Sequence, residues 1–157
     1  MILQIQTGEK NSVLRQKDKP VKEITADIKQ LCLDMAETLA TNNGIGLAGP
    51  QVGKNLRIIC VDLSVYSTDK KQKDAFKMAL INPKVIKKSW KKTIDEEGCL
   101  SLPGQFLKVK RPHKVTVEAQ TVEDQTIKIK ATGLLAKVLQ HEIDHLEGIL
   151  ITDKEKK

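Results

Sequence analysis

The chain has 157 residues, of which 39% are hydrophobic and only 3% aromatic, so it can bury one compact and mainly aliphatic core. The 27 lysines and arginines exceed the 20 aspartates and glutamates, giving a formal net charge of +7. No apolar run approaches the ~20 residues of a membrane span, and residues 1–6 lack the basic start and apolar stretch of a signal peptide. We therefore expect one domain over residues 1–157, no membrane association, and a cytoplasmic location or a similarly reducing organelle matrix.

The cysteine content also favours a reducing compartment. Three cysteines are an odd number, and one of them is a candidate ligand, which argues against a disulfide framework. Cys32 lies on the apolar face of an expected helix and Cys60 within an apolar run. Both are expected to be small buried residues.

Apolar residues recur at helical spacing in the first third of the chain, at Ile24, Ile28, Leu31, Met35 and Leu39. This pattern predicts a helix over residues 25–41, which the Asn-Asn-Gly sequence at 42–44 would end. A strand is predicted around residues 56–63. A polar loop over residues 67–74 and an apolar segment over 78–81 are expected to follow.

The last third of the chain changes from a period of two to a helical period. Alternating apolar residues predict strands around residues 115–119 and 127–131, joined as a hairpin through residues 122–125. Thr132 is expected to cap a final helix that ends at Gly148. Because the strands cluster between two helices, the predicted fold is α+β, with mostly antiparallel sheets packed around the C-terminal helix.

That final helix carries an H-E-x-x-H motif formed by His141, Glu142 and His145. On a helix the two imidazoles lie one turn apart, as in hydrolytic metal sites. Leu134 and Val138 project from the same face within roughly 40°, while Glu142 lies about 80° from Leu134, where a general base is expected. An ordinary amphipathic helix with two surface histidines is less favoured, because these are two of only three histidines in the chain.

Two imidazoles leave a tetrahedral site incomplete, so a third ligand must come from elsewhere in the chain. Cys99 is the candidate, because Gly98 allows close approach of the backbone and strand-like segments flank both. A thiolate at this position would leave the fourth position for water. His113 is interpreted as a strand-edge residue rather than a fourth ligand.

Three segments carry a family resemblance. Residues 44–51 read GIGLAGPQ, residues 97–101 read EGCLS and residues 140–145 read QHEIDH. In this order they resemble the three motifs of the peptide deformylases, and the resemblance extends over most of the chain. It implies a metal-dependent amide hydrolase that removes the formyl group from the N-terminal formyl-methionine of newly synthesised polypeptides and releases formate.

The resemblance also implies the roles of the matching residues. One divalent metal ion would be held by Cys99, His141 and His145. In the family this ion is typically Fe(II), which zinc, nickel or cobalt can replace. Glu142 would take a proton from the attacking water and pass it to the departing amine. The side-chain amide of Gln51 and the backbone N–H of Leu100 would stabilise the negative charge on the formyl oxygen, each by about 3 kcal/mol.

The methionine pocket is assigned by the same resemblance to Ile45, Leu134 and Val138, where burial of the side chain contributes about 1.5–3 kcal/mol. Gly46 would let a substrate strand approach the backbone closely. Without the resemblance, the apolar residues among these would be interpreted as ordinary core.

The chain departs from the family pattern at two positions near the pocket and at its C-terminal end. Phe106 stands where many members have an arginine near the substrate backbone, and Lys137 replaces an apolar residue. Both are expected to alter substrate preference or turnover. Because residues 149–157 are few, the long C-terminal helix of many bacterial members is not expected.

The basic residues raise the question of a nucleic-acid partner. Pairs of lysines occur at residues 70–71, 87–88 and 91–92, and more lie at 154–157. Such clusters could favour ribosomal RNA. The alternative is a solvated surface, because no aromatic platform accompanies the lysines. Ribosome contact is therefore a hypothesis, and we expect a monomer acting on N-formylmethionyl nascent peptides.

Two other functions remain open on the sequence. A zinc endopeptidase shares H-E-x-x-H chemistry, but it generally recruits a downstream ligand, and only Glu147, Asp153 and Glu155 are available here. A non-enzymatic basic adaptor with a structural metal is the second alternative. Intact Gln51 and Glu142 weigh against it.

Overall fold

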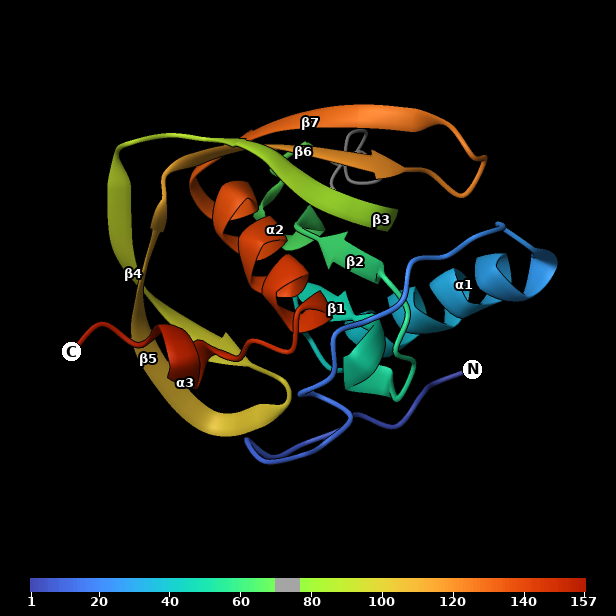
Figure 1. Ribbon diagram of the computed structural model, residues 1–157, viewed down its shortest axis with the longest axis horizontal. Helices are drawn as coiled ribbons and strands as arrows, with labels where there is room; N and C mark the ends of the chain where they lie inside the picture. The colour runs from blue at the N-terminus through green and yellow to red at the C-terminus, as the bar shows by residue number, and fades with distance from the viewer. Residues whose placement is uncertain (70–76) are drawn as a thin grey trace.

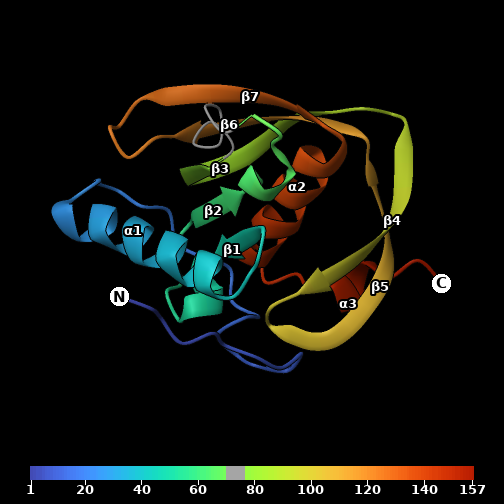
Figure 2. The ribbon, with the colours of Figure 1, turned by 180° about the vertical axis from the view of Figure 1, so that it is seen from behind.

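The computed structural model describes residues 1–69 and 77–157 (Figure 1). Residues 70–74 of the predicted polar loop, including the lysine pair at 70–71, lie outside the described residues. The helix α2 (Gly133–Leu146) crosses the middle of the molecule, with a larger sheet on one side and a two-stranded ribbon on the other (Figures 1 and 2). The predicted α+β fold with antiparallel sheets around the C-terminal helix is confirmed.

The larger sheet has five antiparallel strands in the order β1-β2-β3-β6-β7. Their bounds are β1 (Gly46–Ala48), β2 (Ile58–Asp62), β3 (Lys77–Lys88), β6 (Lys114–Gln120) and β7 (Thr126–Thr132). The strand expected around residues 56–63 and the hairpin expected over 115–131 therefore form as predicted. Short 3₁₀ turns follow β1 and β2, namely η1 (Gly49–Val52) and η2 (Ser64–Tyr66).

The ribbon consists of β4 (Lys92–Cys99) and β5 (Leu102–Pro112). The chain passes from the larger sheet into the ribbon between β3 and β4, and it returns at His113 between β5 and β6. His113 donates its backbone N–H to the carbonyl of Lys91 at 2.9 Å, and its ring contacts the Thr132 hydroxyl at 3.3 Å. This placement agrees with a strand-edge residue rather than a metal ligand.

The helix α1 (Ala26–Thr41) begins after Thr25, whose hydroxyl accepts a hydrogen bond from the backbone N–H of Ile28 at 3.3 Å. The predicted helix is therefore confirmed to within one residue. Cys32 and Cys60 are buried in the core between α1 and the sheet, as expected.

The helix α2 buries Leu139, Ile143 and Leu146 against the larger sheet. Thr132 takes the predicted N-cap position. Its side chain makes no capping hydrogen bond, because the hydroxyl contacts the ring of His113. The helix ends at Leu146, and Gly148 turns the chain with φ +73°. A short helix, α3 (Ile151–Lys154), follows. Within residues 1–69 and 77–157, every helix is too short or too polar to span a bilayer.

Candidate metal centre

Three metal-ligating side chains converge from two parts of the fold. His141 and His145 lie one turn apart on α2, and Cys99 ends β4 at the tip of the ribbon. Their ligand atoms all lie within 4.8 Å of one another. Cys99 Sγ is 3.4 Å from His145 Nε2, which is 3.2 Å from His141 Nε2. The three residues that the sequence predicted as ligands are thus brought together.

These separations suit a single small cation. Nitrogen and thiolate ligands at about 2.0–2.1 Å and 2.3 Å from a tetrahedral ion lie about 3.3–3.6 Å from each other. Burial lowers the pKa of His145 well below its ordinary value, so its ring is neutral and keeps a lone pair for an ion. The donor set of one thiolate and two imidazoles matches zinc and similar divalent metals.

Glu97 orients the ring of His141 from the opposite side. Its Oε1 lies 2.9 Å from His141 Nδ1, which directs Nε2 toward Cys99 and His145. Arg111 on β5 grips the same carboxylate through two hydrogen bonds, at 2.7 Å from Nε and 3.0 Å from Nη2. A carboxylate behind a ligating histidine fixes the ring and increases its basicity.

The charged groups in this network stabilise one another. Burial opposes ionisation of Glu97, but hydrogen bonds from His141 and Arg111 lower its pKa to about 2. Arg111 also binds Asp144 on α2 at 2.8 Å. Sequence reasoning quoted Glu97 only as part of a motif and missed Arg111 and Asp144 as its supports. The one available signal was an acidic residue two positions before the candidate thiolate.

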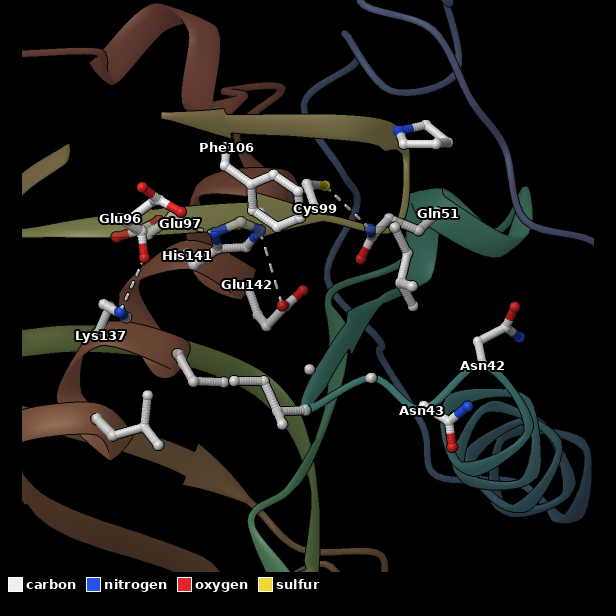
Figure 3. Close-up of a pocket in the computed structure, with 18 of the residues that line it drawn as sticks. Asn42, Asn43, Gln51, Glu96, Glu97, Cys99, Phe106, Lys137, His141 and Glu142 are labelled. Atoms are coloured by element: carbon white, nitrogen blue, oxygen red, sulfur yellow. Dashed lines mark hydrogen bonds and ion pairs between the residues drawn. The ribbon is translucent and has the colours of Figure 1, made fainter. Parts of the chain in front are cut away.

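Gln51 is fixed beside the three ligands by its own hydrogen bonds. Its side-chain oxygen accepts from the backbone N–H of Ala48 at 2.9 Å. This leaves the NH₂ group pointing at Cys99 Sγ, 3.5 Å away (Figure 3). The same group donates to the hydroxyl of Ser101, 3.2 Å away. Ser101 is fully buried. Its role in holding Gln51 was not recognised in the sequence.

Glu142 occupies the position next to the ligands that the helical spacing predicted. Its Oε1 is 3.9 Å from His141 Nε2, and its Oε2 is buried with no hydrogen-bond partner among the described residues. Burial raises the pKa of Glu142 to about 7. A Cβ at Gly46 would overlap this carboxylate, so the glycine is required by Glu142 as well as by any approaching backbone.

These groups open into a cavity of about 740 Å³, which Figure 3 shows with its lining residues. Its walls come from the loop before β1, from the 3₁₀ turns η1 and η2, from β4 with the start of β5, and from α2. Every residue that the sequence placed in the site lines this cavity, apart from the buried His145: Ile45, Gly46, Gln51, Cys99, Leu100, Leu134, Val138, His141 and Glu142. Phe106 and Lys137, the two departures from the expected pattern, line it as well.

Comparison with known proteins identifies the family. The family model described as polypeptide deformylase matches residues 2–157. The chain belongs to the polypeptide deformylase family. The peptide deformylase of Dictyoglomus thermophilum is 45% identical over 142 residues, covering 90% of this chain and 86% of that protein.

Solved deformylase structures have the same fold. The peptide deformylase of Thermotoga maritima superposes with a TM-score of 0.89 at 31% identity, covering 100% of this chain and 99% of that one. A probable peptide deformylase from the Synechococcus phage S-SSM7 gives a TM-score of 0.86 at 42% identity, covering 97% and 99% of the two chains.

The fold of this deformylase also argues against the endopeptidase alternative. Glu147 pairs with Arg57 at 2.7 Å and Asp153 hydrogen-bonds Arg15 at 2.5 Å, so two of the three downstream carboxylates are engaged away from the histidines. Cys99 stands where such an enzyme would need one of them. The adaptor alternative is set aside by the family assignment.

Proposed function

We propose that residues 1–157 form one catalytic domain that hydrolyses the N-formyl group of N-terminal formyl-methionine in newly made polypeptides. The supporting observation is the convergence of Cys99, His141 and His145 at the base of a cavity that Glu142 and Gln51 also line. In a chain that belongs to the deformylase family, this arrangement is a hydrolytic site with a bound cation.

We assign Cys99, His141 and His145 as the ligands of one divalent metal, with Fe(II) as the natural ion and zinc, nickel or cobalt as substitutes. When bound, such an ion lowers the pKa of a water molecule and polarises a carbonyl oxygen. Cys60 and Cys99 are free thiols, which agrees with a reducing compartment such as the cytosol. Fe(II) would also be protected from oxidation there.

Glu142 is the proton carrier in this proposal. Burial brings the pKa of its carboxyl group to about 7, close to the value at which one group can both accept and return a proton at neutral pH. Oε2 has no hydrogen-bond partner among the described residues, so this oxygen is available to water. Glu142 would accept the proton of the attacking water and deliver it to the departing amine.

Gln51 and Leu100 are proposed as the donors to the formyl oxygen. The hydrogen bond from Ala48 fixes the side chain of Gln51 before any substrate arrives, so little reorganisation is needed when charge develops. Leu100 follows Cys99 in the turn between β4 and β5 and lines the cavity. Its backbone N–H therefore lies next to a ligand position.

The substrate would lie between two strand edges. β1 is the outer strand of the larger sheet, and the described residues pair β4 with β5 alone. Gly46 and Gly98 line the cavity from these two edges, so an extended peptide could pair with exposed backbone there. The methionine side chain is assigned to the apolar walls formed by Ile45, Leu134 and Val138.

Formate release from a formyl-methionyl tripeptide tests this function. The Fe(II)-loaded protein, kept free of oxygen, should release formate, whereas Glu142→Ala should retain the metal and lose turnover by about 10²–10⁴-fold, as expected for loss of a general base. An amino-blocked internal peptide serves as the control substrate. Full activity of the metal-loaded Glu142→Ala protein would refute the base assignment, and cleavage of the internal peptide alone would refute deformylation.

Cys99→Ala provides the complementary variant. Losing a thiolate ligand should weaken metal retention during dialysis against a chelator, whereas Glu142→Ala should leave it unchanged. Size-exclusion chromatography with light scattering tests the proposed monomer. A dimer mass would overturn that part of the proposal without touching the chemistry.

A further inference from the structure

The turn between β3 and β4 presents a fully exposed tryptophan among lysines. Trp90 is 100% exposed. It belongs to the connection between β3 and β4, where the chain leaves the larger sheet for the ribbon, and this connection lies at the upper left of Figure 1. Exposed lysines flank it on both strands and on the adjacent start of β6: Lys87, Lys88, Lys91, Lys92 and Lys114. We call residues 87–92 together with Lys114 the Trp90 corner.

The backbone of the Trp90 corner is held by hydrogen bonds. The N–H of Ser89 donates to the carbonyl of Lys114 at 2.9 Å, and the N–H of His113 donates to the carbonyl of Lys91 at 2.9 Å. The Ser89 hydroxyl donates to the carbonyl of Lys91 at 2.8 Å and accepts from the N–H of Lys114 at 3.1 Å. The indole is therefore displayed on an ordered support.

The charge of the Trp90 corner is not neutralised locally. Residues 84–94 and 108–117, the two stretches that meet there, contain no aspartate or glutamate. Among residues 1–69 and 77–157, none of the five corner lysines takes part in a salt bridge, whereas Lys84, further along β3, pairs with Glu118. The corner is thus a positive surface whose ammonium groups have no acidic partner in the part of the chain that the structure describes.

The indole distinguishes this surface from ordinary solvated lysines. A fully exposed tryptophan leaves a large apolar ring in water, and this residue type is enriched where proteins bind partners. Sequence reasoning recognised the lysine pairs but not the tryptophan between them. The expectation that no aromatic platform accompanies the lysines is therefore wrong at this corner.

We propose that the Trp90 corner binds an exposed single-stranded segment of RNA. A flat ring can stack on any base, and lysines on either side of it can contact the phosphates along the strand. An anionic membrane fits less well, because insertion into a bilayer favours an amphipathic helix with several apolar side chains. Here one aromatic ring lies among charges in the short connection between β3 and β4.

The corner can be occupied while the metal centre stays open. β4 runs from Lys92 at the corner to Cys99 at the site, a path of about 23 Å at ~3.3 Å per residue. RNA bound at the corner would therefore hold the enzyme at one end of this strand and leave the cavity free at the other. This inference does not depend on the reaction proposed above.

Trp90 is the chain's only tryptophan, so its fluorescence reports directly on the proposed contact. Titrating the metal-loaded protein with an unstructured RNA of about twelve nucleotides should quench this emission. The same RNA carrying a fluorescent label should gain anisotropy with a Kd that rises steeply with salt. The absence of both signals at low salt would overturn the proposal.

Variants separate stacking from general charge. Trp90→Ala should weaken binding of the labelled RNA about tenfold, as expected for the loss of one stacked base. Lys88→Glu combined with Lys91→Glu should weaken it further and reduce the slope of log Kd against log salt by about 1.4. The charge-matched control is Lys22→Glu combined with Lys54→Glu, two exposed lysines outside the corner. If both double variants lost the same affinity for RNA, binding would depend only on net charge. That result would refute a binding site at the Trp90 corner.

Two further measurements complete the test. Formate release from a tripeptide should be unchanged in Trp90→Ala, which shows that the fold and the metal centre are intact. The wild type could fail to release formate while RNA binding is still lost in the corner variants. In that case the proposed function fails and this inference stands. Vesicles of phosphatidylglycerol form the second arm, because a blue shift of Trp90 emission with vesicles and no response to RNA would assign the corner to membranes instead.

Discussion

At the scale of single residues, the candidate metal centre is supported by a carboxylate that is not itself one of the proposed ligands. Glu97 accepts from both His141 and Arg111 inside the protein and is only 4% exposed. Its pKa of about 2 means that it is ionised at neutral pH. Its charge is therefore a fixed part of the site.

Removing that charge should loosen the metal. Glu97→Gln keeps the size of the side chain but weakens the hold on His141 Nδ1 and leaves Arg111 short of a partner, so we expect metal affinity to fall about 10–100-fold. Competition with a chelator of known affinity measures this loss. Glu96→Gln is the matched control, because Glu96 is the exposed neighbour on the same strand. Equal affinities in the two variants would contradict the positioning role.

Phe106 should determine which residue is favoured after the methionine. Its side chain is 67% exposed and covers Gly98, where a Cβ would meet its ring at 2.9 Å. Tyr66, also exposed, lines the same cavity. The two rings give the cavity an apolar rim that can contact the next substrate side chain.

We expect Phe106→Ala to lower kcat/KM for formyl-Met-Leu and formyl-Met-Phe peptides about tenfold, equivalent to ~1.4 kcal/mol of lost apolar contact. Formyl-Met-Ser peptides should change little, because serine offers little apolar surface. Gln105→Ala, at the exposed preceding position, controls for backbone effects. A uniform loss over all peptides would show that Phe106 supports the site rather than selecting among substrates.

At the scale of elements, Asn82 joins the segment before α1 to the larger sheet. Its side chain accepts from the N–H of Val21 and donates to the carbonyl of Val21, each at 2.8 Å, and it donates to the side chain of Gln120 at 2.7 Å. Its backbone has φ +52°, within the irregular stretch of the β3–β6 pairing. Both the amide and the conformation favour asparagine.

Asn82→Ala should therefore destabilise the fold by about 2–4 kcal/mol, because it removes three partly buried hydrogen bonds and places a Cβ-bearing residue without side-chain support at positive φ. Urea denaturation followed by circular dichroism measures the change. Asn82→Gly removes the same hydrogen bonds but relieves the conformational strain, so it should be the less damaging variant. If Asn82→Gly lost more stability than Asn82→Ala, the positive φ at this position would not be a source of strain.

The sequence predicted elements well where one face is apolar. Apolar residues with a period of 3.6 predicted α1 and α2, and the alternation of apolar and polar residues after Lys114 predicted β6 and β7. The limits of the β4–β5 ribbon were not predicted, because charged residues on β4 obscure the alternation. The H-E-x-x-H spacing and Cys99 were enough to predict the cluster that the structure brings together.

The supports of the ligands could not be predicted in the same way. Arg111 lies opposite Thr93 in the ribbon, whereas Glu97 lies opposite Leu107. Their ion pair therefore depends on a long side chain running along the ribbon, and the contact with Asp144 depends on how α2 packs. Neither relationship is visible in a local pattern.

At the scale of the whole molecule, Asp18 links stability to pH. This aspartate is 4% exposed, its Oδ1 accepts from the Asn55 amide at 2.8 Å, and its Oδ2 has no hydrogen-bond partner among the described residues. Burial raises its pKa from 3.8 to about 6. The folded state therefore holds this proton more tightly than the unfolded state does, so stability from this group is present below pH ~4 and is lost as the pH rises through about 6.

Asp18→Asn removes this titration. The wild type should gain stability relative to Asp18→Asn when the pH is lowered from 7 to 4. The difference between their free energies of unfolding should grow by about 2–3 kcal/mol over this range. Urea denaturation of both proteins at each pH gives the difference, in which titrations common to the two proteins cancel. A difference that stays constant over this range would contradict the raised pKa.

The placement of Cys99 makes the ion a crosslink in the topological sense. The chain leaves Cys99, runs through β5, β6 and β7, and returns to His141 on α2, so an ion held by both residues closes that path into a ring. Arg111 closes the same ring a second time, because it binds Glu97 beside Cys99 and Asp144 beside His145. The ring would therefore stay closed without an ion, so the ribbon would remain attached to the helix while one metal replaced another.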